Sequence, residues 1–396
     1  MKAAVFEQTA TERVVMGQPA ADALRDEAER LGAKKVFLIA SDSLVRGTQE
    51  IEAIRAGLGT RCAGVFSGVQ PHVPRASVIA ATEQARASAA DLIVSIGGGS
   101  VTDASKVVAL ALRHDLRRHE DFEPYHFVVT PEGELRWPAF EGPDVRVVCV
   151  PTTLSGGEFN PLAGATDERV KLKQGYLHRR MTPISVILDP ALTVHTPAWL
   201  WLSTGVRAVD HACETLGSLA SNDYCDGMAE SALRLLAEGL LRVKDDPRDL
   251  EARLKCQVGA WQSMVPIIAG VPMGISHATG HALGGTFDVP HGHTSCVMAP
   301  YALAFNTPVN GARQARISAA LGSPNDPASA VTDRFIRALG MPRSLPEVGV
   351  KPADIPRLAE AVMHDLWTRT NPRPLNSVDE VAAFLRTALQ LSDLPS

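Results

Sequence analysis

The stretch DLIVSIGGGSVTDASK, residues 91–106, indicates the fold class of this chain. An apolar run at 91–96 leads directly into three glycines and then into a segment with helical character. Such a turn lets the backbone approach a ligand closely, and the first N–H groups of the following helix suit a pyrophosphate. The spacing matches neither GxGxxG nor a P-loop. The motif alone therefore leaves two readings open, a phosphate-binding turn and a simple tight turn.

Similar β-branched runs occur on both sides of this stretch, at 34–40 (KKVFLIA), 145–150 (VRVVCV) and 184–189 (ISVILD). Continuous apolar runs are typical of strands buried on both faces of a parallel sheet. Helical patterns separate them, as in ASVIAATEQARASAA at 76–90. This alternation predicts an α/β domain with nucleotide-binding potential. The segment 130–144, which contains Pro and Gly, is predicted to be a surface loop or hairpin.

After about residue 195 the strand pattern disappears and helical periodicity dominates, at 205–220, 231–243, 352–367 and 378–391. We therefore expect a dinucleotide-binding α/β domain over residues 1–195 and an all-helical domain over 196–396. A cleft between two such domains is a common place for a cofactor.

Composition excludes several classes of protein. The 396 residues are 45% hydrophobic and 21% charged, with a net charge of −5, so no broad basic face for nucleic acid is indicated. The most apolar run, 263–275, is interrupted by Pro and Gly, whereas a membrane span needs about 20 apolar residues. The six cysteines are scattered without a CxxC pair, and the N-terminus lacks the apolar core of a signal peptide. We expect a cytoplasmic protein with reduced thiols and no nucleic-acid or membrane partner.

Two further polar turns follow predicted strands. Asp42 comes directly after the first run, where a carboxylate accepts hydrogen bonds from a ribose and repels a 2′-phosphate. It is equally consistent with a helix cap or turn residue. The turn PTTLSGGE at 151–158 carries hydroxyls at Thr152, Thr153 and Ser155. These side chains are candidates to line the same cofactor, although a plain loop is the alternative.

Four of the twelve histidines lie in GISHATGHALGGTFDVPHGHTSC, residues 274–296. His277 and His281 are four apart and share a helix face, and a turn at the Gly-Gly pair would bring His291 back to them. In the helix predicted at 205–220, His211 shares a face with Arg207 and Glu214. Three imidazoles suit zinc or iron(II), whereas an isolated histidine is usually a surface or satisfied core residue.

Five motifs occur in an order that resembles the iron-containing (group III) alcohol dehydrogenases. They are IGGGSVTDASK, PTTLSGGE, ILDP (187–190), TGVRAVDHACE and GISHATGHALGGTFDVPHG, and they cover nearly the whole chain. GGTFDVPH together with NPRP at 371–374 looks most like the maleylacetate reductase branch. The resemblance implies a Rossmann-like N-terminal domain with a parallel sheet, an all-helical C-terminal domain, a dehydroquinate synthase-like architecture, a nicotinamide cofactor and a homodimer.

The resemblance also implies roles for individual residues. The glycine turn would hold the pyrophosphate, Asp42 would favour NAD over NADP, and the hydroxyl turn would contact the adenine–nicotinamide strip. The full set implied for the cofactor is Asp42, Gly97, Gly98, Gly99, Ser100, Asp103, Thr152, Thr153, Ser155 and Lys173, and Lys106 also matches the glycine-turn motif.

The histidines match a metal site with one change. His211, His277 and His291 match three metal ligands, and His281 matches a histidine that relays a proton near the substrate. Metal-binding members of the family have Asp four residues before the position of His211, where this chain has Arg207. A guanidinium cannot ligate a metal and opposes a dication. Asp210 is not expected to replace the missing ligand, because in a regular helix it points away from His211.

Arg207 suits another task, because an arginine binds a carboxylate bidentately and stays charged. The maleylacetate reductase branch acts on a dicarboxylate and is thought to need no metal. Arg207, His281 and His211 are therefore predicted to be catalytic, with Arg207 anchoring an acid group or polarising a carbonyl. The alternative for Arg207 is a structural ion pair with Glu214 or Asp210.

The main hypothesis is thus an NADH-dependent reductase of a small, carboxylate-bearing carbonyl or enone, with maleylacetate giving 3-oxoadipate as the candidate. A metal-dependent alcohol dehydrogenase using iron or zinc is the second hypothesis. A lyase like dehydroquinate synthase and a non-catalytic nucleotide-binding protein are the third and fourth.

Overall fold

The computed structural model describes residues 8–130 and 135–390. The chain divides into two compact units, one of residues 9–195 and one of residues 196–390 together with Gln8. The described strands all lie in the first unit, and the second contains only helices and turns. The predicted combination of a parallel-sheet α/β region and a helical region is therefore confirmed.

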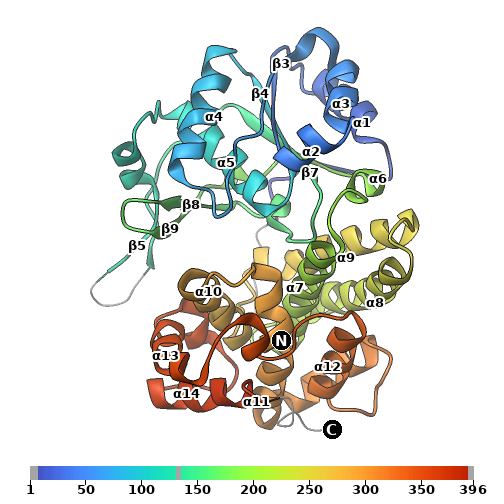
Figure 1. Cartoon of the computed structure of the whole chain (residues 1–396), viewed down its shortest axis with the longest axis vertical. Helices are drawn as coiled ribbons and strands as arrows, with labels where there is room; N and C mark the ends of the chain where they lie inside the picture. The colour runs from blue at the N-terminus through green and yellow to red at the C-terminus, as the bar shows by residue number, and fades with distance from the viewer. Residues whose placement is uncertain (1–7, 131–134, 391–396) are drawn as a thin grey trace. The chain divides into compact units, whose positions relative to one another are not determined.

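A six-stranded parallel sheet forms the centre of the first unit (Figure 1). Its strands are β1 (Arg13–Met16), β2 (Val36–Ala40), β3 (Cys62–Phe66), β4 (Leu92–Gly97), β7 (Arg146–Pro151) and β10 (Ser185–Leu188), in the order β1-β10-β7-β4-β2-β3. The four predicted runs are β2, β4, β7 and β10. β1 and β3 were not predicted. They lie at the two edges of the sheet and have only one buried residue between them, Phe66, so they lack a continuous buried run.

Helices cover both faces of this sheet because each strand buries side chains on alternate sides. Val36, Leu38 and Ala40 of β2 pack in one hydrophobic cluster with α1 (Ala20–Arg30) and α3 (Glu50–Leu58). Phe37 and Ile39 pack in the other cluster with α4 (Arg75–Ala87) and α5 (Gly99–Arg113).

The strand order creates a switch point. The chain runs outward from β2 to β3 in one direction, and from β4 through β7 to β10 in the other. In open α/β sheets, ligands bind at the carboxyl ends of the strands where the order reverses. That point lies between β2 and β4, which end at Ala40 and Gly97.

Two antiparallel hairpins extend the first unit. The predicted loop or hairpin at 130–144 contains β6 (Leu135–Arg136), which pairs with β5 (Val128–Val129). The second hairpin joins β8 (Leu162–Asp167) to β9 (Leu172–Leu177) and was not predicted. It carries Lys173 towards α5, as described below.

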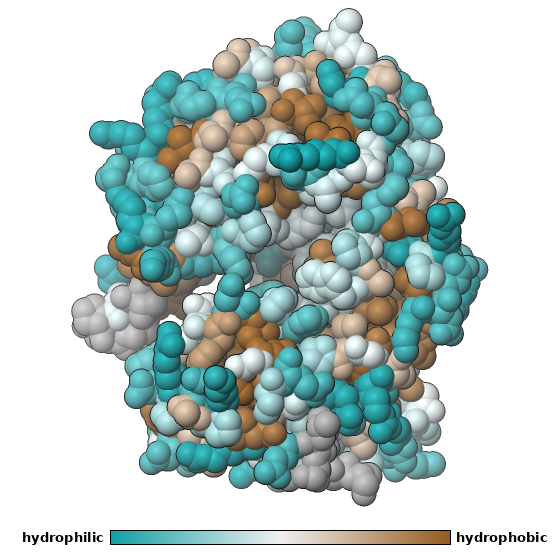
Figure 2. Space-filling view, viewed as in Figure 1, coloured by the Kyte–Doolittle hydropathy of each residue, from teal (hydrophilic) through white to brown (hydrophobic). Residues whose placement is uncertain are grey.

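The second unit is a helical assembly with a core cluster over α10, α11, α13 and α14. Its main helices are α7 (Ala198–Gly217), α8 (Asp223–Asp245), α9 (Leu250–Ile268), α10 (Ile275–Phe287), α11 (His291–Ala320), α12 (Ala328–Ala338), α13 (Ile355–Met363) and α14 (Val378–Thr387). Within the described residues, none of the helices has the length and apolar character that crossing a bilayer requires. The molecular face in Figure 2 is mainly hydrophilic, with hydrophobic residues in separate patches.

The chain reverses between α10 and α11 at a place other than the one predicted. Gly284 and Gly285 lie inside α10, so the prediction of a turn at this glycine pair is wrong. The helix instead ends at Phe287. Its C-cap residue Asp288 has the left-handed φ of 56°, and Pro290 precedes α11. Asp is one of the few non-glycine residues that adopt this conformation readily.

Candidate functional site

Three polar turns meet at the carboxyl ends of adjacent strands in the first unit. Asp42 opens α2 (Asp42–Gly47) directly after β2, and the glycine turn follows β4. Next to it, β7 ends in the hydroxyl turn, whose Thr152 N–H donates to the Gly97 carbonyl over 2.9 Å. The predicted cofactor residues on these turns therefore lie along one edge of the sheet, at the switch point.

The glycines at 97–99 leave little room for side chains, least of all at Gly97. A Cβ at Gly97 would lie 2.8 Å from Val101 Cγ2, one at Gly98 would lie 3.1 Å from Thr153 Cγ2, and one at Gly99 would lie 3.2 Å from Ser155 Oγ. The turn is therefore tight, as the simpler interpretation requires. It also leads into α5 without any side-chain cap, so the first N–H groups of a 15-residue helix are available to an anion.

Asp42 lies beside this turn and does not cap the helix that it opens. Ser41 occupies the N-cap position of α2. The Asp42 carboxylate forms an ion pair with Arg46 (2.8 Å) and accepts a hydrogen bond from Ser67 Oγ (3.4 Å). Its side chain is 45% exposed, so its oxygens remain accessible to a ribose.

The lysines of the glycine-turn region differ in their surroundings. Lys106 is fully buried, and its Nζ donates to the carbonyls of Gly157, Asn160 and Leu162 over 2.5, 2.6 and 2.9 Å. It therefore anchors the chain after β7 to α5. Lys173 on β9 is half exposed and lies 3.4 Å from Asp103 on α5, an arrangement that leaves both side chains accessible.

The second unit brings charged and imidazole side chains of α7, α10 and α11 into one buried group, here called the histidine–arginine cluster. It consists of Arg207, Asp210, His211 and Glu214 on α7, Ser276 and His277 on α10, and Ser295 on α11.

The start of α10 is fixed by two side chains from distant segments. Glu214 accepts hydrogen bonds from the N–H groups of Gly274 and Ser276, each over 3.0 Å, and Asn371 of the NPRP motif accepts from Ile275 N–H over 3.0 Å. A Cβ at Gly274 would lie 2.7 Å from Asn371 Oδ1 and 3.1 Å from Glu214 Oε1. Glycine at 274 therefore allows both carboxamide and carboxylate to approach the helix start.

His277 is held in one tautomer by this arrangement. Its Nδ1 lies 2.7 Å from Glu214 Oε2, and a carboxylate only accepts, so Nδ1 carries the hydrogen. The lone pair is then on Nε2, which is buried and has no hydrogen-bond partner. His211 stacks on the His277 ring at 4.9 Å, and its Nδ1 is also unpartnered. Burial lowers the pKa of both imidazoles and the nearby positive charge of Arg207 adds to it, so both rings are neutral.

Arg207 is buried without a carboxylate partner. The residue is 7% exposed, and its Nη1 donates only a long hydrogen bond of 3.4 Å to Ser295 Oγ. Over the described ranges, no carboxylate oxygen lies within 4.0 Å of its guanidinium, so the alternative ion pair with Glu214 or Asp210 is not formed. Burial lowers the pKa of Arg207 to about 10, and the side chain stays charged at neutral pH.

Asp210 contacts two residues of α10. Its Oδ2 accepts from Ser276 Oγ (2.8 Å) and lies 3.5 Å from His277 Nδ1, while Oδ1 is buried without a partner. Asp210 is therefore directed at Ser276 and His277 of α10, and no ligand group of the described residues contains both Asp210 and His211. Burial raises the pKa of Asp210, and the neighbouring Glu214 raises it further.

The three predicted metal ligands do not form one group. In the described part of the chain, two sets of ligand atoms lie within 4.8 Å of one another, namely Asp210–Glu214–His277 and His119–Asp167–Glu168. His291 instead begins α11 and stacks on His281, with ring centroids 6.0 Å apart. In the first set, Nδ1 of His277 is already bound to Glu214, and the cation of Arg207 is adjacent. These residues do not fit a divalent metal.

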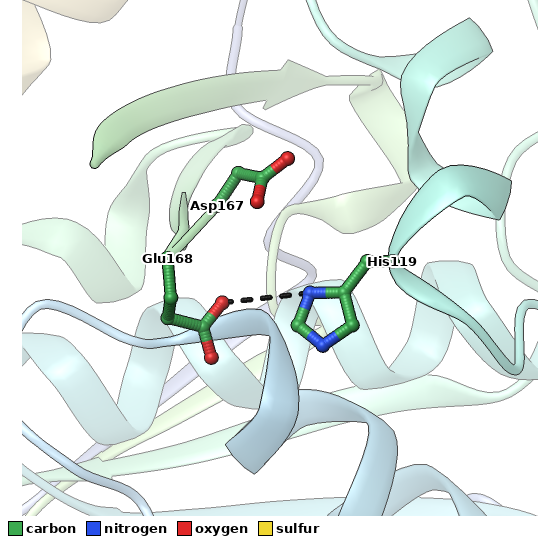
Figure 3. A group of neighbouring side chains, drawn as sticks. All are labelled: His119, Asp167 and Glu168. Carbon is green, nitrogen blue, oxygen red and sulfur yellow. Dashed lines mark ion pairs between the residues drawn. The ribbon is translucent and has the colours of Figure 1, made fainter. Parts of the chain in front are cut away.

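The second set is also occupied by protein contacts. Figure 3 shows His119 directed at Glu168, with the dashed line marking their 3.6 Å ion pair. Asp167 binds Arg75 and Arg169, which hold the pKa of its carboxyl well below the usual range. Glu168 accepts from the first N–H groups of α4. With two guanidinium groups at Asp167, this group stabilises the fold and does not suit a cation.

One contact of the second unit was missed by the sequence analysis. Asp365 Oδ2 lies 2.9 Å from Nδ1 of His281, the predicted proton relay. The two residues are 84 positions apart, and no spacing pattern in the sequence connects them.

Two family models together match most of this chain. Residues 11–190 match the family model "Iron-containing alcohol dehydrogenase", and residues 201–389 match "Fe-containing alcohol dehydrogenase family, C-terminal". Maleylacetate reductase 1 of Cupriavidus pinatubonensis is 32% identical over 92% of each chain. Dehydrogenase FUM7 of Gibberella moniliformis is 33% identical over 92% of this chain and 94% of its own.

This chain is also similar to solved structures of maleylacetate reductases. The crystal structure of maleylacetate reductase from Rhizobium sp. strain MTP-10005 superposes with a TM-score of 0.81, at 30% identity, over 98% of this chain and 99% of that one. The chain therefore belongs to the iron-containing alcohol dehydrogenase family and is an NAD(P)-dependent oxidoreductase.

Proposed function

We propose that this protein is an NADH-dependent reductase of a small, carboxylate-bearing carbonyl or enone, with maleylacetate as the substrate and 3-oxoadipate as the product. The observation that carries the proposal is Arg207, a buried guanidinium that makes no ion-pair contact within 4.0 Å in the described part of the chain, although Asp210 and Glu214 lie near enough to favour its charge. A buried charge without a partner is strongly unfavourable. A substrate carboxylate would supply the missing partner and bind bidentately.

In this proposal the sheet edge of the first unit holds the cofactor. The pyrophosphate binds the N–H groups at the start of α5, and Asp42 accepts from the adenosine ribose, which favours NADH. NADH bound there would supply a hydride to the unsaturated carbon of the substrate and would be left as NAD⁺. His281 supplies the balancing proton, and Arg207 stabilises the carboxylate or the developing oxyanion.

The relatives support the substrate class. Several proteins named maleylacetate reductase, from different bacteria, align at 30 to 32% identity over more than nine-tenths of this chain. The similar Dehydrogenase FUM7 carries a different name, so family membership alone does not select the substrate. Arg207 is the feature of this chain that favours an acid.

A metal-dependent alcohol dehydrogenase is the second candidate, favoured by the unpartnered ring nitrogens of His211 and His277. It requires iron or zinc beside Arg207, which electrostatics opposes. A lyase or a non-catalytic nucleotide-binding protein would consume no NADH in the presence of a carbonyl.

The test measures NADH oxidation at 340 nm with maleylacetate, using protein dialysed against a strong chelator and checked for metal content. We expect sustained turnover without metal, with 3-oxoadipate formed in amounts equal to the NADH consumed. Activity that appears only after iron or zinc is added would support the metal-dependent dehydrogenase. No activity under both conditions would exclude maleylacetate and leave other oxo acids and aldehydes to be assayed.

A further inference from the structure

The α10 helix carries two imidazoles, four residues apart, and each is held by a carboxylate from another element. His277 donates from Nδ1 to Glu214 of α7 over 2.7 Å, and Nδ1 of His281 lies 2.9 Å from Asp365 Oδ2. By the same argument as for His277, Nδ1 of His281 carries the hydrogen, so its Nε2 presents a lone pair. A proton arriving at Nε2 is then stabilised by the carboxylate on the other side of the ring.

The two pairs differ in their access to water. The His277 side chain is 4% exposed and that of Glu214 is 9% exposed. His281 is 41% exposed, while its partner Asp365 is 16% exposed. A group that supplies a proton in every turnover has to recover that proton from solvent. Of the two imidazoles, His281 has the exposure that this exchange needs.

Asp365 is itself fixed in position. It is the N-cap of the short helix η7 (Leu366–Thr370), and its Oδ1 accepts from Trp367 N–H over 2.9 Å. One oxygen therefore anchors the carboxylate to the backbone while the other binds the imidazole. The parallel ring of His291, 6.0 Å away and 12° from coplanar, restricts His281 on a further side.

From this geometry we propose that Asp365 is the positioning residue of His281, which fixes the Nδ1–H tautomer and directs Nε2 for proton transfer. The inference rests on the proposed function, in which His281 supplies the proton. Asp365 acts through His281 and does not itself contact the substrate in this proposal.

The decisive variant is Asp365→Asn in the full-length protein. Asparagine is as good an N-cap as aspartate, so the contact with Trp367 is retained. The charge at His281 is removed, and the amide can present an N–H group to Nδ1, which favours the opposite tautomer. A matched control is Glu50→Gln, which removes the carboxylate from another exposed pair, His195 Nε2 and Glu50 Oε1 at 3.0 Å.

Two measurements are made on each variant. The ¹⁵N spectrum of histidine-labelled protein, with the His281 signals assigned from a His281→Gln variant, reports which ring nitrogen carries the hydrogen. Steady-state kinetics with maleylacetate reports kcat and KM separately. For Asp365→Asn we expect loss of the Nδ1–H tautomer of His281 and a fall in kcat of about tenfold to a hundredfold, within the usual contribution of general acid catalysis, with KM changed less than twofold. Glu50→Gln should leave both unchanged.

An unchanged His281 tautomer in Asp365→Asn would overturn the proposal, whatever the activity. A changed tautomer with unchanged kcat would overturn it as well, because positioning would then not matter to the reaction. If the wild-type protein does not turn over maleylacetate, the proposed function fails, and the tautomer spectra still decide whether Asp365 sets the state of His281.

Discussion

At the scale of the residue, a single substitution relative to the metal-binding pattern sets the charge of the histidine–arginine cluster. Arg207 stands where metal-binding members of the family have a carboxylate, and it faces two neutral imidazoles. Its contact with Ser295 is long, and the guanidinium has five N–H donors. The guanidinium therefore has N–H donors left for an anion with several acceptor oxygens.

Replacing Arg207 by methionine removes the charge without leaving a large cavity. Methionine is of similar length and apolar, and replacing buried charges by apolar residues is often neutral or stabilising. We expect Arg207→Met to keep or raise the melting temperature while kcat/KM for maleylacetate falls about a hundredfold, since charged hydrogen bonds contribute roughly 1.5–3 kcal/mol each.

Arg207→Lys is the companion variant. It keeps the charge and loses the planar fork, so its kcat/KM should lie between those of wild type and Arg207→Met. Differential scanning fluorimetry and the NADH assay check both variants. Wild-type kcat/KM in Arg207→Met would contradict a role of the guanidinium in substrate binding.

At the scale of the element, the turn after β7 is held by charged groups that the helix α5 and the turn itself contribute. Lys106 donates to three carbonyls of this segment, and Glu158 lies in its short helix η3 (Gly157–Phe159). Glu158 is 3% exposed, and burial raises the pKa of its carboxyl to about 7. The stability of this element is therefore expected to depend on pH.

The direction of this dependence follows from the raised pKa. At low pH, Glu158 is protonated in the folded and the unfolded chain. As the pH rises from about 4.5 towards 7, the carboxyl of Glu158 loses its proton in the unfolded chain but keeps it in the folded chain. The free energy of unfolding therefore falls, by about 1.4 kcal/mol for each unit of difference between the two pKa values. Glu158→Gln does not titrate. Its free energy of unfolding relative to wild type should therefore rise by roughly 2–3 kcal/mol between pH 5 and pH 8. Urea denaturation at the two pH values measures this difference, and a constant difference would contradict it.

At the scale of the whole molecule, the turns proposed to bind the nucleotide and the histidine–arginine cluster belong to different compact units. The two hydrophobic clusters on the faces of the sheet draw only on residues between 20 and 192. All six strands of the sheet lie in the unit of residues 9–195. That unit therefore has what an independently folding domain requires.

We accordingly expect a fragment of residues 9–195 to fold alone and bind NADH. Circular dichroism with a cooperative thermal transition tests folding, and NADH fluorescence titration tests binding, with a Kd within about tenfold of the full-length value. The control is the same fragment with Gly99→Val, which places a branched side chain against Ser155 Oγ. It should weaken NADH binding more than it lowers the melting temperature. A fragment without a cooperative transition would show that the helical unit is needed for folding.

The sequence by itself determined the fold class, the four central strands, the glycine turn and the family. These features depend on short-range patterns, namely continuous apolar runs, helical periodicity and residues without a side chain at a crowded turn. Arg207 was also evident from the sequence, because a changed residue type within a matched motif needs no coordinates to be seen.

Only the tertiary structure decided which side chains act together. It paired His277 with Glu214 and His281 with Asp365, residues 63 and 84 positions apart. In the described residues, the ligand atoms of His211, His277 and His291 do not all lie within 4.8 Å of one another. It also placed Lys106 in the interior, where it holds backbone carbonyls. The physical reason is that hydrogen bonds of buried groups require a fit of about 3 Å between particular atoms. That fit depends on how whole helices pack, which the periodicity of each helix alone does not specify.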